Sequence, residues 1–251
     1  MVTFFGQTDI GRRRALNEDT IYAQDGLFLV CDGMGGHKAG EVASKLAAEA
    51  IAGFVKRSDE DPEMTWPYGY DTNLSYDANR LGTAIKLANR VVFRKGSSND
   101  EYTGMGTTVA AVLVPTRRSQ MTYAHVGDSR VYLLRAGTLR QLTRDDSWAN
   151  LGWSTGADED ATDSPVKNIL TKALGARDDV EFDVVDEPLM AGDVVLLCSD
   201  GLTNMLSDTR ILEVVTAHAP DLETATGELI ARANAEGGRD NISVVLFRYP
   251  A

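Results

Sequence analysis

Two continuous apolar runs in this chain each lead into an aspartate that is followed by a glycine. Leu27 to Cys31 precedes Asp32-Gly33, and Val194 to Cys198 precedes Ser199-Asp200-Gly201. Short apolar runs bounded by turn residues are typical of strands that are buried on both faces. A carboxylate at the end of such a strand is costly to bury unless something pairs with its charge. The sequence therefore predicts buried strands whose ends carry charges in need of a partner.

Two further segments place an aspartate in a similar setting, and together the four suggest one shared partner. These segments are Gly127-Asp128-Ser129 and Asp240-Asn241. Each segment taken alone is also an ordinary turn signal. Divalent cations such as Mg²⁺ and Mn²⁺ prefer carboxylate, carbonyl and water oxygens, and neighbouring glycines let a carbonyl approach an ion. We therefore expect a divalent cation site.

Length, composition and charge restrict the fold and the partners. A chain of 251 residues, 43% of them hydrophobic and without a linker-like segment, is expected to form one domain over residues 1–251. Its net charge of −12 argues against nucleic acid and anionic membrane surfaces as partners. The apolar runs are far shorter than the roughly 20 residues of a spanning helix, and the N-terminus lacks a signal-peptide layout. We expect a soluble, cytoplasmic monomer.

The two cysteines, Cys31 and Cys198, lie in the apolar runs beside the proposed ligand aspartates. Two cysteines do not make a disulfide framework in a chain of this size. Thiolate ligation of a metal is the alternative, but the rest of the site is rich in oxygen. We interpret both as small core residues.

Apolar periodicity predicts pairs of helices between blocks of strands. Strict β-α-β alternation is absent, so the pattern favours an α+β fold with antiparallel sheets, without choosing among such folds. Helices are expected over residues 37–56, 73–96, 208–217 and 221–236. Strands are expected over residues 2–6, 20–24, 26–32, 106–114, 120–126, 130–135, 138–142, 180–187, 193–199 and 242–247.

Six short motifs occur in a fixed order between residues 6 and 248. They are Arg14-x-x-x-Glu18-Asp19, Asp32-Gly33-Met34-Gly35-Gly36, Gly106-Thr107-Thr108, Gly127-Asp128-Ser129-Arg130, Ser199-Asp200-Gly201 and Asp240-Asn241. The ordered set resembles the PPM, or PP2C, family of metal-dependent serine/threonine phosphatases in its bacterial form. This resemblance implies a four-layer α-β-β-α sandwich, with two central antiparallel sheets and a helix pair outside each.

The resemblance also implies how two Mn²⁺ or Mg²⁺ ions are held. Asp32 would bridge the two ions, and the main-chain carbonyl of Gly33 would bind the second. Asp200 and Asp240 would complete the protein ligands of the first ion. Two such ions neutralise a phosphate, align it, and lower the pKa of a bridging water so that hydroxide attacks in line.

The resemblance gives supporting roles in ion binding to the other acidic residues of the motifs. By the same resemblance, Glu18 and Asp19 would bind the ions mainly through ordered waters. Asp128, together with Asp200, would support a weaker third ion. The alternative for Asp128, from the residues alone, is a buried aspartate that pairs with Arg130 or caps a turn.

The resemblance assigns phosphate binding and protonation of the leaving group to different residues. Arg14 matches the family's phosphate-binding arginine, and its guanidinium can hold two phosphate oxygens in a planar fork. Many eukaryotic members carry a histidine, proposed as the general acid, where this chain has Met34, which cannot donate a proton. His37 is a possible substitute, although a helix N-terminus lowers the pKa of a histidine. Residues 147–166 match the family's variable flap.

We therefore expect a phosphatase acting on phosphoserine and phosphothreonine in proteins, the substrates of a serine/threonine kinase. One alternative is a metal-dependent hydrolase of small phosphomonoesters. Another is a metal-binding regulatory member without activity, but such members are expected to lose ligand aspartates or the arginine. This chain retains Arg14, Asp32, Asp200 and Asp240.

Overall fold

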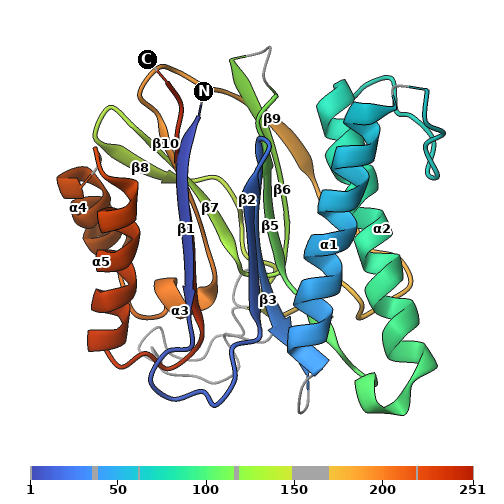
Figure 1. The fold of residues 1–251 in the computed structure, drawn as a ribbon, viewed down its shortest axis with the longest axis horizontal. Helices are drawn as coiled ribbons and strands as arrows, with labels where there is room; N and C mark the ends of the chain where they lie inside the picture. Colours follow the sequence, from blue (N-terminus) through green and yellow to red (C-terminus); the bar gives the residue numbers. More distant parts are fainter. Residues whose placement is uncertain are drawn as a thin grey trace, which may run out of the picture.

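The computed structural model describes residues 2–35, 39–61, 63–115, 119–148, 170–218 and 220–250, whose strands form two antiparallel sheets (Figure 1). The first sheet has the order β1 (Thr3–Asp9), β11 (Ile242–Arg248), β10 (Val194–Cys198), β7 (Arg130–Arg135) and β8 (Thr138–Gln141). The second has the order β2 (Asp19–Gln24), β3 (Leu27–Met34), β5 (Val109–Leu113), β6 (Gln120–Val126) and β9 (Val184–Pro188), and β4 (Gly106–Thr107) pairs with β3.

A pair of helices covers the outer face of each sheet. Figure 1 shows α1 (Ala39–Glu60) and α2 (Tyr76–Ser98) beside the second sheet, and α4 (Asp208–His218) and α5 (Leu222–Ala235) beside the first. Two short helices complete the described elements, η1 (Asp100–Tyr102) and α3 (Asp200–Thr203). The arrangement confirms the α+β sandwich of four layers that the motifs implied. Within the described residues, no helix combines the length and the apolar character needed to cross a membrane.

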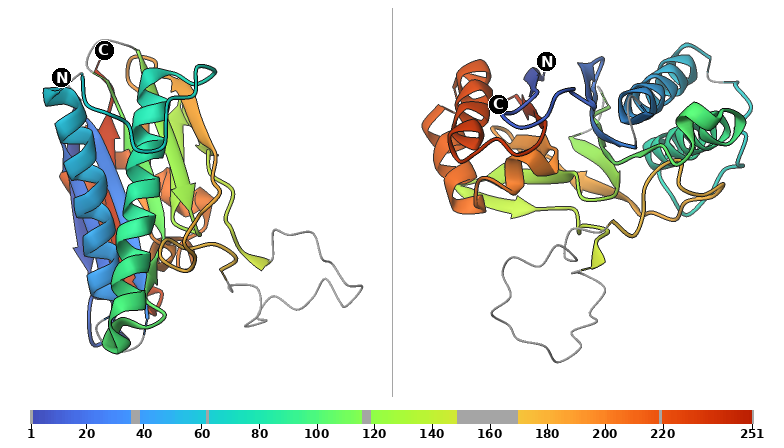
Figure 2. Two further views of the ribbon diagram at one scale, coloured as in Figure 1. Left: turned by 90° about the vertical axis from the view of Figure 1, so that its right-hand side faces the viewer. Right: turned by 90° about the horizontal axis from the view of Figure 1, so that it is seen from below.

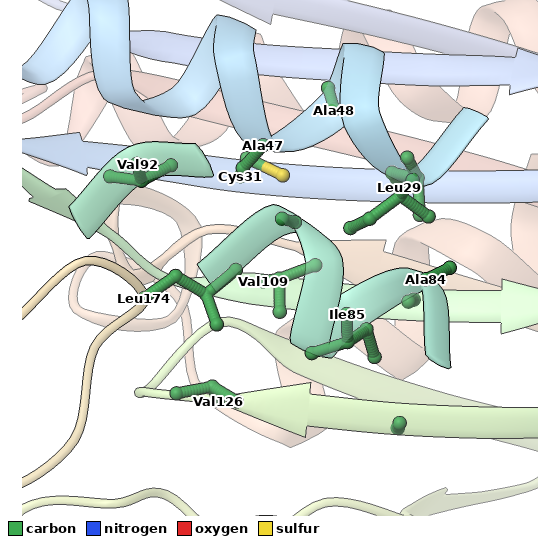
Figure 3. Close-up of a cluster of buried hydrophobic side chains, with 14 of the residues drawn as sticks. Leu29, Cys31, Ala47, Ala48, Ala84, Ile85, Val92, Val109, Val126 and Leu174 are labelled. Atoms are coloured by element: carbon green, nitrogen blue, oxygen red, sulfur yellow. The ribbon is translucent and has the colours of Figure 1, made fainter. Parts of the chain in front are cut away.

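Three apolar cores lie between the four layers, and strand β3 contributes to two of them. Leu29 and Cys31 face the core beneath α1 and α2, which Figure 3 shows, whereas Phe28 and Val30 face the core between the sheets. Phe28 stacks there on Phe247 of the other sheet, with ring centroids 4.4 Å apart. Burying a side chain of this size contributes about 1.5–3 kcal/mol. Burial on both faces explains why the apolar runs are continuous rather than alternating.

The turn between β2 and β3 sets the register of the strands that carry two of the acidic residues. Asp25 and Gly26 both have positive φ, 53° and 77°, as a two-residue hairpin turn requires. The register that follows places Asp19 directly opposite Asp32. Two carboxylates therefore face each other across the strands, an arrangement that is destabilising unless a positive charge intervenes.

Several predicted boundaries differ from the structure. The strand expected over residues 106–114 is broken at Thr108, because Thr107 pairs with Gly33 on one side and with Leu174 on the other. The helix expected from residue 73 begins at Tyr76, after Ser75, whose hydroxyl accepts a hydrogen bond from the amide of Ala78. The helix expected to end at residue 56 continues to residue 60, the strand expected from residue 180 begins at 184, and α3 was not predicted. Both cysteines are buried and free.

Candidate active site

Residues from both sheets meet in a cavity of about 220 Å³ at one end of the sandwich. Asp32 lies at the end of β3, and Asp128 follows β6 in the same sheet. Asp200 follows β10, and Asp240 precedes β11, its antiparallel neighbour in the other sheet. The end of one antiparallel strand lies beside the start of the next, so these positions converge. The lining residues are Arg14, Glu18, Asp32, Gly33, Met34, Gly35, Thr108, Asp128, Leu170, Asp200 and Asp240.

Asp19 lies behind this cavity rather than in its lining. Its side chain is buried, and its Oδ2 accepts a hydrogen bond of 2.6 Å from the hydroxyl of Ser243 in the opposite sheet. The neighbouring Glu18 is anchored through its main chain, since its carbonyl accepts from the amide of Gly33 at 3.1 Å and from the hydroxyl of Ser44 at 2.6 Å. The carboxylates of Glu18 and Asp19 are thus set beside Asp32 by hydrogen bonds from different layers.

The buried carboxylates of this region lack compensating partners among the described residues. Oε1 of Glu18, Oδ1 of Asp19 and Oδ1 of Asp200 are buried without a hydrogen bond there. Burial raises the pKa of Asp19 to about 7, and burial followed by repulsion from neighbouring carboxylates raises the pKa of Asp128 to about 7 and that of Asp200 to about 6. The same two causes, with Asp19 as the main neighbour, raise the pKa of Asp32 well above its usual value.

These features suit divalent cations. The candidate donors are all oxygens, they carry excess negative charge, and three buried carboxylate oxygens have no hydrogen-bond partner among the described residues. Glycine is required at position 33, because a Cβ there would lie 2.1 Å from the carbonyl oxygen of Gly40. Among the described residues, no three His, Cys, Asp or Glu side chains form a compact cage by themselves. That spacing fits ions whose coordination is completed by a carbonyl and by water.

The two threonines after Gly106 hold the main chain of Asp32. The hydroxyl of Thr108 accepts from the amide of Asp32 at 3.0 Å, and the amide of Thr108 donates to the carbonyl of Asp32 at 2.8 Å. The hydroxyl of Thr107 also donates to that carbonyl, at 2.9 Å. The Thr108 hydroxyl is shared with that of Ser129, 2.7 Å away. The break in the strand at Thr108 therefore serves to fix Asp32, a role that the sequence did not reveal.

Asn241 ties the N-terminal loop to the same end of the sandwich. Its Nδ2 donates to the carbonyls of Ile10 (3.0 Å) and Leu16 (2.9 Å), and its Oδ1 accepts from the amide of Glu18 at 2.8 Å. The loop between these contacts carries Arg14. The Asp-Asn pair was the only sequence signal for Asn241, and it assigned no role to the amide.

Arg14 lies against one of the cavity carboxylates. Its Nη2 is 2.6 Å from Oδ2 of Asp240, and its side chain is 48% exposed. The hydrogen bond to Asp240 raises the pKa of Arg14, and Glu18 and Asp32 act in the same direction at longer range. The guanidinium therefore stands at the mouth of the cavity with solvent access on one side.

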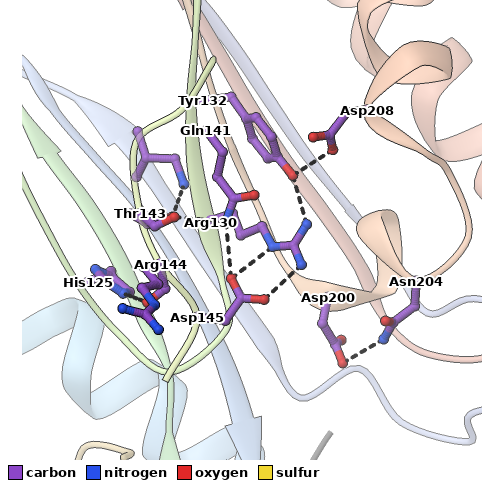
Figure 4. A network of polar contacts seen from close by, with 11 residues as sticks. His125, Arg130, Tyr132, Gln141, Thr143, Arg144, Asp145, Asp200, Asn204 and Asp208 are labelled. Atoms are coloured by element: carbon purple, nitrogen blue, oxygen red, sulfur yellow. Dashed lines mark hydrogen bonds and ion pairs between the residues drawn. The ribbon is translucent and has the colours of Figure 1, made fainter. Parts of the chain in front are cut away.

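The alternative partner for Asp128 is engaged elsewhere. Nε and Nη2 of Arg130 donate to the two oxygens of Asp145, at 2.9 and 2.7 Å (Figure 4). Nη1 of Arg130 donates to the hydroxyl of Tyr132 at 2.9 Å, and that hydroxyl donates to Asp208 at 3.0 Å. The interpretation of Asp128 as the ion-pair partner of Arg130 is therefore wrong, because Asp145 holds the fork of this arginine.

Asp200 opens the short helix α3 and is held by its neighbour one turn later. Nδ2 of Asn204 donates to Oδ2 of Asp200 at 2.9 Å (Figure 4). This leaves the buried Oδ1 as the oxygen available to a cation.

Of the two positions considered for a proton donor, 34 and 37, the structure describes only Met34. Met34 lines the cavity, and its thioether cannot donate a proton. His37 and residues 149–169, most of the expected flap, lie outside the described residues.

Comparisons with known proteins agree with this geometry. The model of the protein phosphatase 2C family matches residues 11–243, and the chain belongs to that family. The serine/threonine phosphatase stp of Listeria monocytogenes is 38% identical, over 96% of this chain and 93% of its own length. The serine/threonine protein phosphatase PstP of Mycobacterium tuberculosis is 36% identical, over 98% of this chain but 45% of its own.

Solved structures show the same fold. The crystal structure of M. tuberculosis PstP matches with a TM-score of 0.84 and 34% identity, covering 100% of this chain and 99% of that one. The catalytic domain of PstP in complex with two manganese ions matches with a TM-score of 0.82 and 33% identity, covering 100% and 99%.

Proposed function

We propose that this protein hydrolyses phosphoserine and phosphothreonine in other proteins, and that it does so at the carboxylate cavity. Family membership makes the chain a metal-dependent protein phosphatase, and its relatives stp and PstP are named serine/threonine phosphatases. The proposal for the site rests on one observation. Four aspartates from two sheets converge on one cavity beside buried carboxylate oxygens that lack partners.

The assignment of residues to two divalent cations follows the family resemblance, and the cavity supports it by bringing these residues together. Asp32 is the candidate ligand of both ions, and the Gly33 carbonyl would serve the second. Asp200 and Asp240 serve the first. When bound, the cations would neutralise the phosphate and lower the pKa of coordinated water. Mn²⁺ and Mg²⁺ are the candidates, and manganese is the ion named for PstP.

More distant carboxylates are assigned supporting roles. Glu18 and Asp19 would act through waters, which suits side chains that each have a buried oxygen without a hydrogen-bond partner. Asp128 and Asp200 would hold a weaker third ion, since one carboxylate plus one shared carboxylate is a sparse set of ligands. The raised pKa values of these two aspartates are expected where a positive charge is missing.

Residues of the chain itself would bind and orient the substrate. Arg14 would hold two phosphate oxygens with its planar fork of donors. The hydrogen bonds from Thr107 and Thr108 would keep Asp32 in place as the phosphate binds. Met34 leaves protonation of the serine or threonine oxygen to another group, and His37 is a candidate for it.

The remaining expectations complete the proposal. The chain would act as a single domain over residues 1–251 and as a monomer in the cytoplasm. Its substrates would be proteins phosphorylated by a serine/threonine kinase. Neither nucleic acid nor a membrane surface would be a partner, given the net charge of −12.

A metal-dependent assay on peptides tests this function. Phosphoserine, phosphothreonine and phosphotyrosine peptides, together with a small sugar phosphate, are incubated with Mn²⁺, with Mg²⁺ or with excess chelator. We expect turnover of the first two peptides only, and only with a divalent cation. Asp32→Asn should abolish it, whereas Glu213→Gln, an exposed carboxylate on α4, should not. Turnover in excess chelator, or faster hydrolysis of the sugar phosphate, would contradict the proposal.

A further inference from the structure

We propose that a groove leading from the carboxylate cavity along helix α2 binds the part of the phosphoprotein substrate that flanks the phosphorylated residue, and selects basic segments. The inference rests on the function proposed above and adds a specificity to it. It depends on four observations: the start of the groove next to the cavity, the hydrogen bonds that hold its floor, its acidic side chains, and an exposed tyrosine in its wall.

The groove begins next to the cavity along the chain. Leu170 lines the carboxylate cavity, and the next residues, Thr171 and Lys172, line a hollow of about 430 Å³. This hollow shares residues 179–181 with another of about 470 Å³. The second hollow is bounded by the N-terminal half of α2, at Ala78, Asn79, Gly82, Thr83 and Lys86. Figure 2 shows the segment that leads into β9 passing beside this helix.

The floor of the groove is attached to α2 by one buried side chain. Oδ1 of Asn89 accepts from the amide of Gly175 at 2.8 Å. Nδ2 of Asn89 donates to the carbonyls of Arg177 (3.1 Å) and Asp178 (3.0 Å). These contacts fix the segment before any peptide arrives, which lowers the entropy cost of binding.

The segment that forms the floor has two faces of different character. Side chains alternate between opposite faces of an extended chain. One set packs against the core beneath α1 and α2, the other set is exposed, and residues of both sets line the far hollow. The inward set is Val180, Phe182 and Val184, and the exposed set is Asp179, Glu181 and Asp183.

Negative charge increases along the groove away from the cavity. Lys172, which is paired with Asp146, and Arg177 line the hollow nearer the cavity together with Asp179 and Glu181, so opposite charges are balanced there. The far hollow adds Asp71 and Asp183 to these two acids against the single cation Lys86, so negative charge is in excess. Among the described residues, none of the acids that line the two hollows takes part in an ion pair. A peptide with a phosphate at one end and basic residues at the other complements this pattern.

An exposed tyrosine in the wall of the far hollow gives a second reason to expect cationic side chains in the substrate. Tyr68 lines the far hollow and is 40% exposed. The ammonium group of Lys86 already lies 5.8 Å from the centre of its ring. An aromatic face with adjacent carboxylates is a favourable site for lysine or arginine.

The length of the groove sets the spacing of the basic residues. Asn89 marks the near part of the groove and Asn79 the far part, a separation of about 15 Å at 1.5 Å per helical residue. An extended peptide covers about 3.3 Å per residue. The groove therefore spans about five residues of extended peptide, and the basic residues should lie at least that far from the phosphorylated residue.

Peptide pairs of identical core sequence test the groove. One phosphothreonine peptide carries an extension with three arginines five to nine positions from the phosphothreonine, and its partner carries serines at the same positions. One pair has this extension on the N-terminal side of the phosphothreonine, and a second pair has it on the C-terminal side. Each exposed ion pair changes affinity by about 1.5-fold to fivefold. We expect kcat/KM to favour the basic peptide of one pair by about threefold to thirtyfold, mainly through KM, and to lose the preference at high salt.

Matched variants locate the effect. In Asp179→Asn/Glu181→Gln/Asp183→Asn, the ratio of kcat/KM for basic over neutral peptide should fall to about 1. The control, Glu213→Gln/Glu223→Gln/Glu228→Gln on α4 and α5, removes as many charges from the opposite outer layer and should retain the ratio (Figure 1). The single reversal Glu181→Lys should shift preference toward a peptide with glutamates in the extension.

The possible outcomes distinguish a failure of the groove proposal from a failure of the proposed phosphatase function. Equal kcat/KM for basic and neutral peptides with the unaltered protein would overturn the groove and leave the phosphatase intact. An unchanged ratio in the groove variant would overturn it as well. Absence of cation-dependent turnover with every phosphopeptide would instead remove the proposed function.

Discussion

Neutralising one of the clustered carboxylates should stabilise the cation-free protein. Asp32 stands directly opposite Asp19 across β2 and β3, and both carry raised pKa values because they are buried beside other acids. Asp32→Asn removes a negative charge and retains the size of the side chain. The substitution that abolishes catalysis should therefore strengthen the fold when no cation is present.

The size of the gain follows from the geometry of the strand pair. Opposed side chains in an antiparallel pair have Cβ atoms about 5 Å apart. At an effective dielectric constant of about 20, two unit charges at that distance repel by about 3 kcal/mol. Partial protonation of Asp19, whose pKa is about 7, relieves some of this repulsion near neutral pH. We expect a gain of about 1–3 kcal/mol, or about 2–10 °C in Tm for a chain of this length.

Thermal unfolding at pH 7.5 measures the effect. In excess chelator, Asp32→Asn should melt above the unaltered protein, and Glu213→Gln, an exposed single-charge control, should change the stability by less than about 0.5 kcal/mol. In Mn²⁺ the order should reverse, because binding to the folded state stabilises only the protein that retains its ligands. A variant that melts lower in chelator would refute the reasoning, since favourable contacts of Asp32 would then outweigh its repulsion.

Three other predictions concern pH and single side chains. The folded-state pKa of Asp128 is about 7 and that of Asp200 about 6, above the usual value of 3.8, so the folded protein binds these protons more tightly. In excess chelator, the unfolding free energy measured by urea denaturation should therefore fall as pH rises from 5.5 to 8. A rise over that range would contradict the raised pKa values of Asp128 and Asp200. Arg14→Ala should raise KM for phosphopeptides at least tenfold and change the cation affinity little. The control Arg13→Ala, at an exposed neighbouring arginine, should leave KM unchanged. Unchanged kinetics in Arg14→Ala would show that another group binds the phosphate. Asp128→Ala should lose most turnover of phosphopeptides but less of aryl phosphates, whose leaving oxygen needs no proton, and equal losses would separate Asp128 from leaving-group protonation.

Local sequence carried enough information for most helices and strands but not for the way in which they pair and stack. The apolar runs of β3 and β10 are unbroken because each strand is buried on both faces, and that pattern needs no knowledge of neighbours. The pairing of β1 with β11 joins the two ends of the chain, and no local preference encodes it. Thr108 likewise sits in a run of good strand formers. Only contacts with distant residues break the strand there.

The acidic residues of the site were more predictable than the residues that hold them. A carboxylate at the end of a buried strand is anomalous by itself, so Asp32 and Asp200 were identifiable from their surroundings in the sequence. The partners of Asn241 lie more than 220 residues away, and an asparagine beside an aspartate is an ordinary turn pair. The alternative that paired Arg130 with Asp128 fails because Asp145 becomes the neighbour of Arg130 only when β7 and the segment after β8 fold together.

Arg14 connects the charge balance of the cavity with substrate binding. It is the one cation among the described residues that line the cavity, and it contacts Asp240 at 2.6 Å. An ion pair as exposed as this one stabilises by about 0–1 kcal/mol, so little is lost when it opens. A divalent cation bound to Asp240 would weaken the pair further, and a phosphate offers the guanidinium two oxygens in a planar fork. The same side chain can therefore offset the carboxylates in the cation-free protein and turn to the phosphate once cations are bound. A lysine would supply the charge without the paired donors, which is why the chemistry of this position favours arginine.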